Sequence, residues 1–66
     1  MVKNNLKEIR MREYMMSPQE FANKIGVNIR TYYSWERGEV GPSLETALNV
    51  AVKLNKKVED IWYVER

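Results

Sequence analysis

Apolar residues recur every three or four positions along most of the chain, a spacing typical of amphipathic helices. Capping residues and glycines divide this pattern into five predicted helices. The first runs from about residue 5 to Tyr14, with Asn5 as its N-cap and Glu8 completing a capping box. The other four are expected at about residues 18–25, 29–37, 44–54 and 58–62.

The second and third predicted helices are separated by a turn of only about three residues. Ser17 is the expected N-cap of the second helix, with a proline after it and Glu20 closing a capping box. Gly26 ends this helix, because glycine adopts left-handed backbone angles without a Cβ penalty. Asn28 is the predicted N-cap of the third helix, which stops before Gly38.

The fourth helix is expected to begin after Ser43, another N-cap residue. Its apolar residues at three- and four-residue spacing are Leu44, Ala47, Leu48, Ala51 and Leu54. Asn55 can end it in the left-handed conformation. The fifth helix is brief and leaves a tail of β-favouring residues. The pattern predicts an all-α fold of five helices, with residues 1–66 as a single domain.

Composition narrows the functions that such a domain can have. Cysteine and histidine are both absent, which removes disulfides, thiol nucleophiles, the usual zinc ligands and the commonest general base. No nucleophile–base set, phosphate loop or metal cluster is evident, so we expect neither an enzyme nor a cofactor. The longest apolar run is too short for a membrane span and no signal peptide is recognisable, which predicts a soluble, cytoplasmic protein.

The net charge of +2 is unevenly placed along the chain. Residues 1–38 carry seven Lys and Arg against four Glu, whereas residues 39–66 carry four Lys and Arg against five acidic residues. The amino-terminal part is therefore the expected phosphate-facing side. An excess of this size is also common on solvated faces, so it carries weight only together with a motif.

Two helices that cross over a short turn need a small residue at their contact and a residue with positive φ in the turn. Ala22 and Gly26 meet these needs. The apolar positions on the inner faces of both helices are Phe21, Ile25, Val27, Tyr32 and Trp35. Core packing is the expected role of both Tyr32 and Trp35, rather than base stacking. The outward face of the third helix then carries Ile29, Arg30, Tyr33 and Ser34.

Five segments carry a family resemblance: NLKEIR at 5–10, EFANKIGV at 20–27, Thr31 with WERG at 35–38, PSLETAL at 42–48 and VEDIW at 58–62. With these segments in register, nearly the whole chain resembles the Cro/C1-type helix-turn-helix family of phage and bacterial repressors. The resemblance implies that the third helix enters the major groove of double-stranded DNA. It also implies a partly buried ion pair between Arg10 and Glu36.

The resemblance places base contacts on Ile29, Arg30, Tyr33 and Ser34. Arg30 is the strongest candidate, because a guanidinium can bond guanine O6 and N7 together. Ile29 could pack on a thymine methyl group and Ser34 could bond either strand. For Tyr33, DNA contact and simple surface exposure both remain open.

Phosphate contacts in this family come from the start of the second helix and the loop after the third. In this chain the residues are Gln19, Asn28, Arg37 and Gly38, with Lys24 as a further candidate. Pro18 stands where glutamine is common and Glu39 where a basic residue is usual. These two departures predict a modest affinity for phosphate.

The carboxyl end carries more apolar surface than five short helices can cover, which usually marks an interface. We expect a homodimer through the fifth helix, formed by Val52, Val58, Ile61, Trp62 and Val64. Two-fold symmetry would suit a palindromic operator. Some short members of the family add a small antiparallel sheet, which residues 1–3 and 63–65 could form here. The alternative is that Trp62 only closes the monomer core.

The leading functional hypothesis is a DNA-binding transcriptional repressor without a small-molecule effector, because little of the chain remains beyond the five helices. The alternative is a protein-interaction module, such as an antitoxin that uses the same fold to bind a toxin. An antitoxin usually needs an extension beyond the helix-turn-helix. We therefore favour the repressor.

Overall fold

Side-chain caps begin the three longest helices, as the sequence predicts. Ser17 accepts a hydrogen bond from the Glu20 amide at 3.2 Å, and the Glu20 carboxylate accepts one from the Ser17 amide at 2.9 Å, which completes the capping box. Asn28 accepts from Thr31 at 2.8 Å, and the Ser43 hydroxyl accepts from the Thr46 amide at 3.2 Å. Because these bonds are local, the residue types predict them directly.

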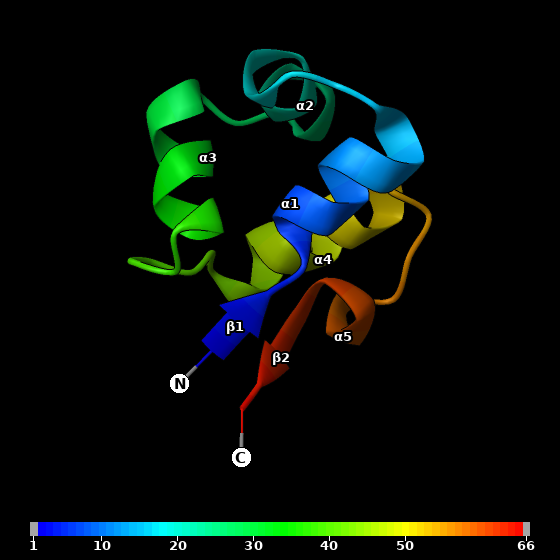
Figure 1. Cartoon of the computed structure of the whole chain (residues 1–66). Coiled ribbons are helices and arrows are strands. Elements are labelled where there is room, and N and C mark those ends of the chain that lie inside the picture. The colour runs from blue at the N-terminus through cyan, green and yellow to red at the C-terminus, as the bar shows by residue number, and fades with distance from the viewer. Residues whose placement is uncertain (1, 66) are drawn as a thin grey trace.

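The computed structural model describes residues 2–65. In chain order its elements are β1 (Val2–Asn4), α1 (Leu6–Glu8), η1 (Ile9–Tyr14), α2 (Pro18–Ile25), α3 (Ile29–Glu36), α4 (Leu44–Lys53), α5 (Val58–Ile61) and β2 (Trp62–Val64). Figure 1 shows α2 and α3 as neighbours at one end of the molecule and the two short strands at the other. The mostly helical fold with a small sheet is confirmed. Within the described residues, no helix has the length and apolar character that crossing a membrane requires.

The start of the first helix differs from the prediction. Asn5 makes no side-chain capping bond, and its amide group instead donates to the Asp60 carbonyl at 3.1 Å. The backbone amide of Asn5 donates to the Ile61 carbonyl at 2.8 Å. The Asn4 side chain, one residue earlier, accepts from the Leu6 amide at 3.1 Å. The predicted capping box at Asn5 is wrong, because a contact with the distant fifth helix takes up this residue.

The first helix widens into the π-helical stretch η1 after one turn. In an α-helix, residues five apart lie on different faces, whereas the wider π turn brings them toward the same side. Ile9 and Tyr14 accordingly both face the core. The Tyr14 ring lies 5.8 Å from the ring of Phe21, and its hydroxyl donates to the Leu54 carbonyl at 3.2 Å. This stretch therefore joins the first helix to both α2 and the end of α4.

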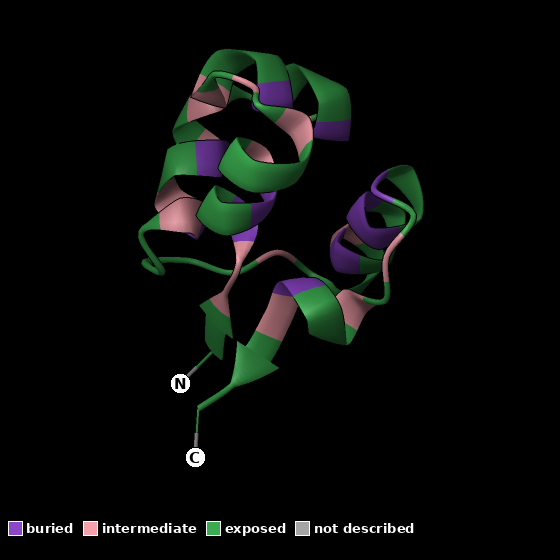
Figure 2. Ribbon diagram, turned by 45° about the vertical axis from the view of Figure 1, so that its right-hand side comes forward, coloured by how far each residue is buried: buried purple, intermediate pink, exposed green. Residues whose placement is uncertain are grey.

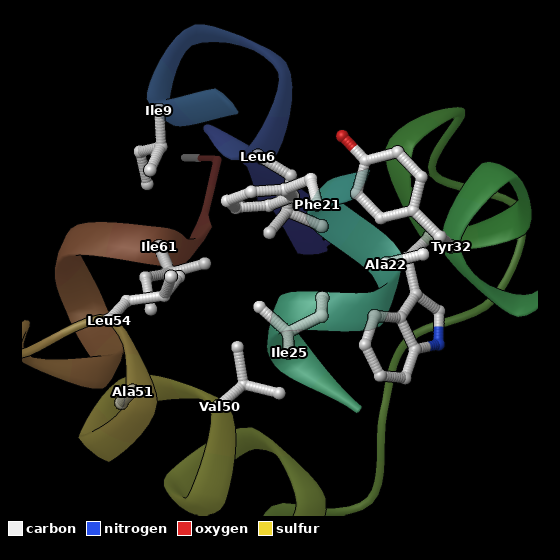
Figure 3. Packing of buried hydrophobic residues seen from close by; sticks show 11 residues of the cluster. Leu6, Ile9, Phe21, Ala22, Ile25, Tyr32, Val50, Ala51, Leu54 and Ile61 are labelled. Atoms are coloured by element: carbon white, nitrogen blue, oxygen red, sulfur yellow. The ribbon is translucent and has the colours of Figure 1, made fainter. Parts of the chain in front are cut away.

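One hydrophobic cluster fills the space between the helices. Its buried members are Leu6, Ile9, Phe21, Ala22, Ile25, Tyr32, Trp35, Val50, Ala51, Leu54 and Ile61. Figure 3 shows Phe21, Ala22, Ile25 and Tyr32 gathered with Leu6, Val50 and Ile61. In Figure 2 the buried segments of the helices face the interior. The predicted core roles of Tyr32 and Trp35 are confirmed, with exposed fractions of 0% and 4%.

Only part of the apolar pattern on α4 is buried. Ala47, Val50 and Ala51 face the core, at the three- and four-residue spacing of one helix face. Leu44 and Leu48 belong to the same sequence pattern but are 74% and 47% exposed. The apolar stripe of α4 is thus wider than the surface that the other helices cover.

The chain ends form the expected small antiparallel sheet. Val2 pairs with Val64, Lys3 with Tyr63 and Asn4 with Trp62. Trp62 belongs to β2, so α5 ends one residue earlier than predicted. Met1, which the sequence placed in this sheet, lies outside the described residues.

Met15 ends the first helix in the left-handed region, with φ 51° and ψ 44°, although it has a Cβ atom. Replacing Met15 with glycine should raise the free energy of unfolding by about 0.5–1 kcal/mol, because the Cβ strain is relieved. Urea unfolding measures the change. Met11→Gly is the matched control: Met11 is also exposed but lies within the helix, where glycine costs about 1 kcal/mol. Equal destabilisation by both variants would contradict the prediction.

Candidate nucleic-acid interface

The turn between α2 and α3 is held by backbone geometry at its glycine. Gly26 has φ 82°, and its amide donates to the Ala22 carbonyl at 2.9 Å. The Val27 amide donates to the same carbonyl at 3.0 Å. Lys53 of α4 reaches across to the Ile25 carbonyl at 3.2 Å and satisfies the end of α2. The short turn that the sequence predicts is confirmed, and α4 supports it.

The inner side of α3 is fixed by packing and by a polar network. Tyr32 contacts Phe21 with ring centroids 5.6 Å apart, and its hydroxyl accepts from Arg10 Nε at 3.0 Å. Arg10 Nη2 lies 3.5 Å from Glu36 Oε1, and Nη1 donates to the Met16 carbonyl at 3.1 Å. The predicted partly buried pair of Arg10 and Glu36 is therefore present. Arg10 thereby links η1, the segment before α2 and the end of α3.

Burial shapes the protonation of this network. Desolvation, and then the neighbouring Glu36 carboxylate, raise the pKa of Tyr32 well above its usual value, so the hydroxyl stays neutral. Burial acts to lower the pKa of Arg10, but its contacts with Tyr32 and Glu36 outweigh that effect and raise it. Glu36 Oε2 is buried and has no hydrogen-bond partner among the described residues. The carboxylate thus depends on Arg10 for compensation of its charge.

The small sheet also supports α3, a connection that the sequence did not suggest. The Asn4 side chain donates to the Trp35 carbonyl at 2.6 Å. Trp62 packs edge-on against Trp35, with ring centroids 5.9 Å apart. Both chain ends therefore contact the last turn of α3. Contacts with α2, η1 and the small sheet therefore hold α3 in place and leave its outer face exposed.

The predicted base-contact residues fall into two groups. Arg30 and Tyr33 are exposed, and Ser34 is partly exposed. A shallow hollow of about 320 Å³ opens beside Arg30 and Ser34, with Val40 on its wall. Ile29 is half-buried and packs against the core, so only part of its side chain faces outward. Arg30 and Tyr33 are thus accessible to a ligand, whereas the partly exposed Ser34 lies 3.4 Å from Glu39 through its hydroxyl.

The predicted phosphate-contact residues lie at both ends of α2 and at both ends of α3. The Gln19 amide donates to the Asn23 side chain at 3.0 Å, and the Asn28 side-chain oxygen is taken up by its capping bond. Lys24 Nζ lies 4.9 Å above the Tyr14 ring, an arrangement typical of a cation–π contact. Gln19, Lys24 and Asn28 are exposed, so each can still reach an external anion.

The loop after α3 holds a pair that the sequence did not predict. Arg37 donates twice to Glu39, from Nε and Nη2, each at 3.0 Å. Gly38 stands between them with φ 77°. Two opposite charges on either side of a glycine are only a weak sequence signal of an ion pair, because the sequence does not show in which direction the side chains point. Arg37 is thus at its predicted place but already engaged.

The predicted dimer residues differ in how much surface they present. Val52 and Val64 are 78% and 61% exposed, and Val58 and Trp62 are partly buried. Ile61 has no exposed surface, because it lies in the core with Leu54 and Leu6. Ile61 must therefore be removed from the candidate interface. Leu48, which the prediction left out of this surface, is exposed on α4 one turn before Val52.

The Arg10 network generates a prediction about stability. Arg10→Met leaves the Glu36 carboxylate buried without compensation and should lower the free energy of unfolding by about 2–4 kcal/mol. The double variant Arg10→Met with Glu36→Met removes both charges and should recover most of that loss. Urea unfolding at neutral pH measures both variants. If the double variant is no more stable than Arg10→Met alone, the buried charge of Glu36 is not the cause of the loss, and the prediction is wrong.

Comparison with known proteins agrees with this geometry. The model of the helix-turn-helix family matches residues 6–61. An uncharacterized HTH-type transcriptional regulator of Archaeoglobus fulgidus is 34% identical over 61 residues, which are 92% of this chain and 84% of that protein. The uncharacterized HTH-type transcriptional regulator YgzD of Bacillus subtilis is 33% identical over 64 residues, 97% and 96% of the two chains.

A third relative, an uncharacterized HTH-type transcriptional regulator of Methanocaldococcus jannaschii, is 34% identical over 64 residues, again 97% of this chain and 96% of the relative. The matches span the turn, the inner faces of α2 and α3, and the helices that support them. The chain belongs to the Cro/C1-type helix-turn-helix family of DNA-binding transcriptional regulators.

Proposed function

We propose that this regulator is a repressor that binds a palindromic operator as a homodimer and contacts the major groove with α3. The observation that carries the proposal is the division of α3 into two faces. Tyr32 and Trp35 are buried, whereas Arg30 and Tyr33 on the other side are exposed. A helix held so firmly on one side can present the other to base edges at a fixed angle.

Arg30 and Ser34 carry the sequence preference in this proposal. Arg30 is exposed in the first turn of α3, where its guanidinium can bond guanine O6 and N7. Ser34 lies one turn later beside the same hollow. Tyr33 and the outward part of Ile29 supply apolar contacts, for which thymine methyl groups are the matching chemistry.

The helix ends supply the phosphate contacts. Gln19 lies in the first turn of α2 and Asn28 caps α3, so both stand at the positive ends of helix dipoles. Lys24, Arg37 and Gly38 complete the set. Such contacts fix the position of a protein on DNA without favouring one sequence.

Dimerisation uses the C-terminal apolar patch, which we define as Val52, Val58, Trp62 and Val64. Val52 and Val64 present most of their side chains to the surface, and Ile61 supports the patch from beneath. In the proposed dimer, a symmetric contact of the two patches directs both copies of α3 to the same DNA duplex. Half-sites about 34 Å apart, one helical turn of DNA, would then be bound together.

An operator selected from a random DNA pool tests base readout. Arg30→Ala should relax the preference at one base position and cost about 1–3 kcal/mol on the selected site. Gln19→Ala should weaken selected and random DNA by the same factor, because it removes a phosphate contact. Fluorescence anisotropy measures both, and Lys7→Ala on α1 is the control for the loss of an exposed positive side chain. If Arg30→Ala weakens binding to every sequence by the same factor, Arg30 does not contact a base.

Whether the wild-type chain prefers any sequence decides between the two functional classes. Specific sites normally bind at least about 10³-fold more tightly than random DNA. A selected site less than about a hundredfold better than random would favour a protein-interaction module instead.

Sedimentation of Val52→Glu tests the patch. Val52 is 78% exposed, so glutamate is tolerated in the monomer but places a charge in the proposed apolar contact. The variant should sediment as a monomer and bind operator DNA more weakly. Met11→Glu, at an exposed apolar residue outside the patch, should leave the dimer intact. An unchanged Val52→Glu dimer would place the interface elsewhere.

A further inference from the structure

The loop after α3 carries an ion pair with an unusually complete set of contacts for a surface position. Arg37 donates to both oxygens of Glu39, each at 3.0 Å, in the side-by-side geometry that guanidinium and carboxylate favour. Ser34 Oγ lies 3.4 Å from Glu39 Oε1 as a third contact. The carboxylate therefore takes up one proposed phosphate contact and one proposed base contact at the same time.

The backbone brings these side chains together before any ligand arrives. The Glu39 amide donates to the Ser34 carbonyl at 3.0 Å, and the Gly38 amide donates to the Trp35 carbonyl at 2.9 Å. Gly38 turns the chain with φ 77°, a conformation that glycine adopts without strain. Arg37 and Glu39 thus project from a closed turn rather than from a free loop. The turn has already ordered the backbone, so pairing costs only the rotamer freedom of the two side chains.

A carboxylate and a phosphate present the same features to a guanidinium: negative charge and paired oxygen acceptors. We propose that Glu39 is an internal competitor of DNA phosphate, which holds Arg37 in the free protein and thereby sets the affinity and salt dependence of DNA binding. This inference rests on the proposed function of Arg37 as a phosphate contact.

The Arg37–Glu39 pair is suited to exchange of the carboxylate for a phosphate rather than to stabilisation of the fold. The side chains of Arg37 and Glu39 are 58% and 56% exposed, and exposed ion pairs contribute little to the stability of a fold. Their contact can therefore open without disturbing the core. Hydrogen bonds from Arg37 hold the pKa of Glu39 below its usual value, so the competing charge persists under mildly acidic conditions. In the free state, the pair contributes no net charge to the phosphate-facing surface.

Glu39→Gln keeps the shape of the side chain and removes its charge. The variant should bind operator DNA more tightly than the wild-type protein at low salt. One additional phosphate contact steepens the slope of log K against log salt by about 0.9, so this advantage should shrink about 3.5-fold between about 50 and 200 mM salt. Anisotropy titrations across that range measure both quantities. An unchanged affinity and slope would overturn the proposal.

The mechanism requires that Glu39 act through Arg37. In an Arg37→Gln background, Glu39→Gln should therefore bring no gain in affinity. An equal gain in both backgrounds would show that Glu39 merely repels DNA, and the proposal would be wrong. Glu8→Gln, which removes one exposed negative charge from α1, should not reproduce the gain of Glu39→Gln.

The same titrations separate this inference from the broader proposal. If the wild-type protein prefers no sequence, the proposed operator function fails, whatever Glu39 does. If the wild-type protein binds its operator specifically and Glu39→Gln changes only the preference at one base position, Glu39 contacts a base and is not a competitor for Arg37. A cytosine amino group is the base group that a carboxylate would bind in that case.

Discussion

Tyr32 and Trp35 anchor α3 against the rest of the domain, and the outer face of the helix can serve DNA only while this anchor holds. Aromatic side chains bury about 150–250 Å² each, which at about 25 cal/mol per Å² gives several kcal/mol apiece. The neighbouring ion pair of Arg10 and Glu36 is close to neutral by comparison, because desolvation offsets most of its attraction. Packing therefore supplies the energy. The polar network fixes the orientation of α3, because Arg10 donates to the Tyr32 hydroxyl from one direction.

Features that depend on a few neighbouring residues were predictable from the sequence. The caps at Ser17, Asn28 and Ser43 and the turn at Gly26 all follow from local hydrogen bonds and backbone preferences. Asn5 is the instructive exception. Its residue type is equally suited to capping, but bonds to the fifth helix, more than fifty positions away, determine its role. No local rule contains that information.

The candidate site shows the same division. Helical periodicity separates the inner residues of α3 from the outer ones, and the structure places them accordingly except for Ile29, which is half-buried against the core. Periodicity could not show that Ile61 is buried while Val52 is exposed, because both are apolar residues near the same chain end. It also could not show that Arg37 meets Glu39 or that Lys24 covers Tyr14, since these contacts depend on side-chain rotamers. Residue type indicates what a side chain can bind, whereas the fold decides what it already binds.

The small domain and its modest charge bear on how it could hold DNA. The net charge of a single copy is only +2, and Arg37 is paired to Glu39. Both weaken the attraction to phosphate, which supplies most non-specific affinity for DNA. Joining two copies makes the second contact intramolecular, which raises affinity without any new side-chain contact. Weak phosphate contacts in each copy then favour specificity, because neither copy binds random DNA tightly. In the proposed dimer, stable occupancy of the operator would require that the outer faces of both α3 helices contact their bases at the same time.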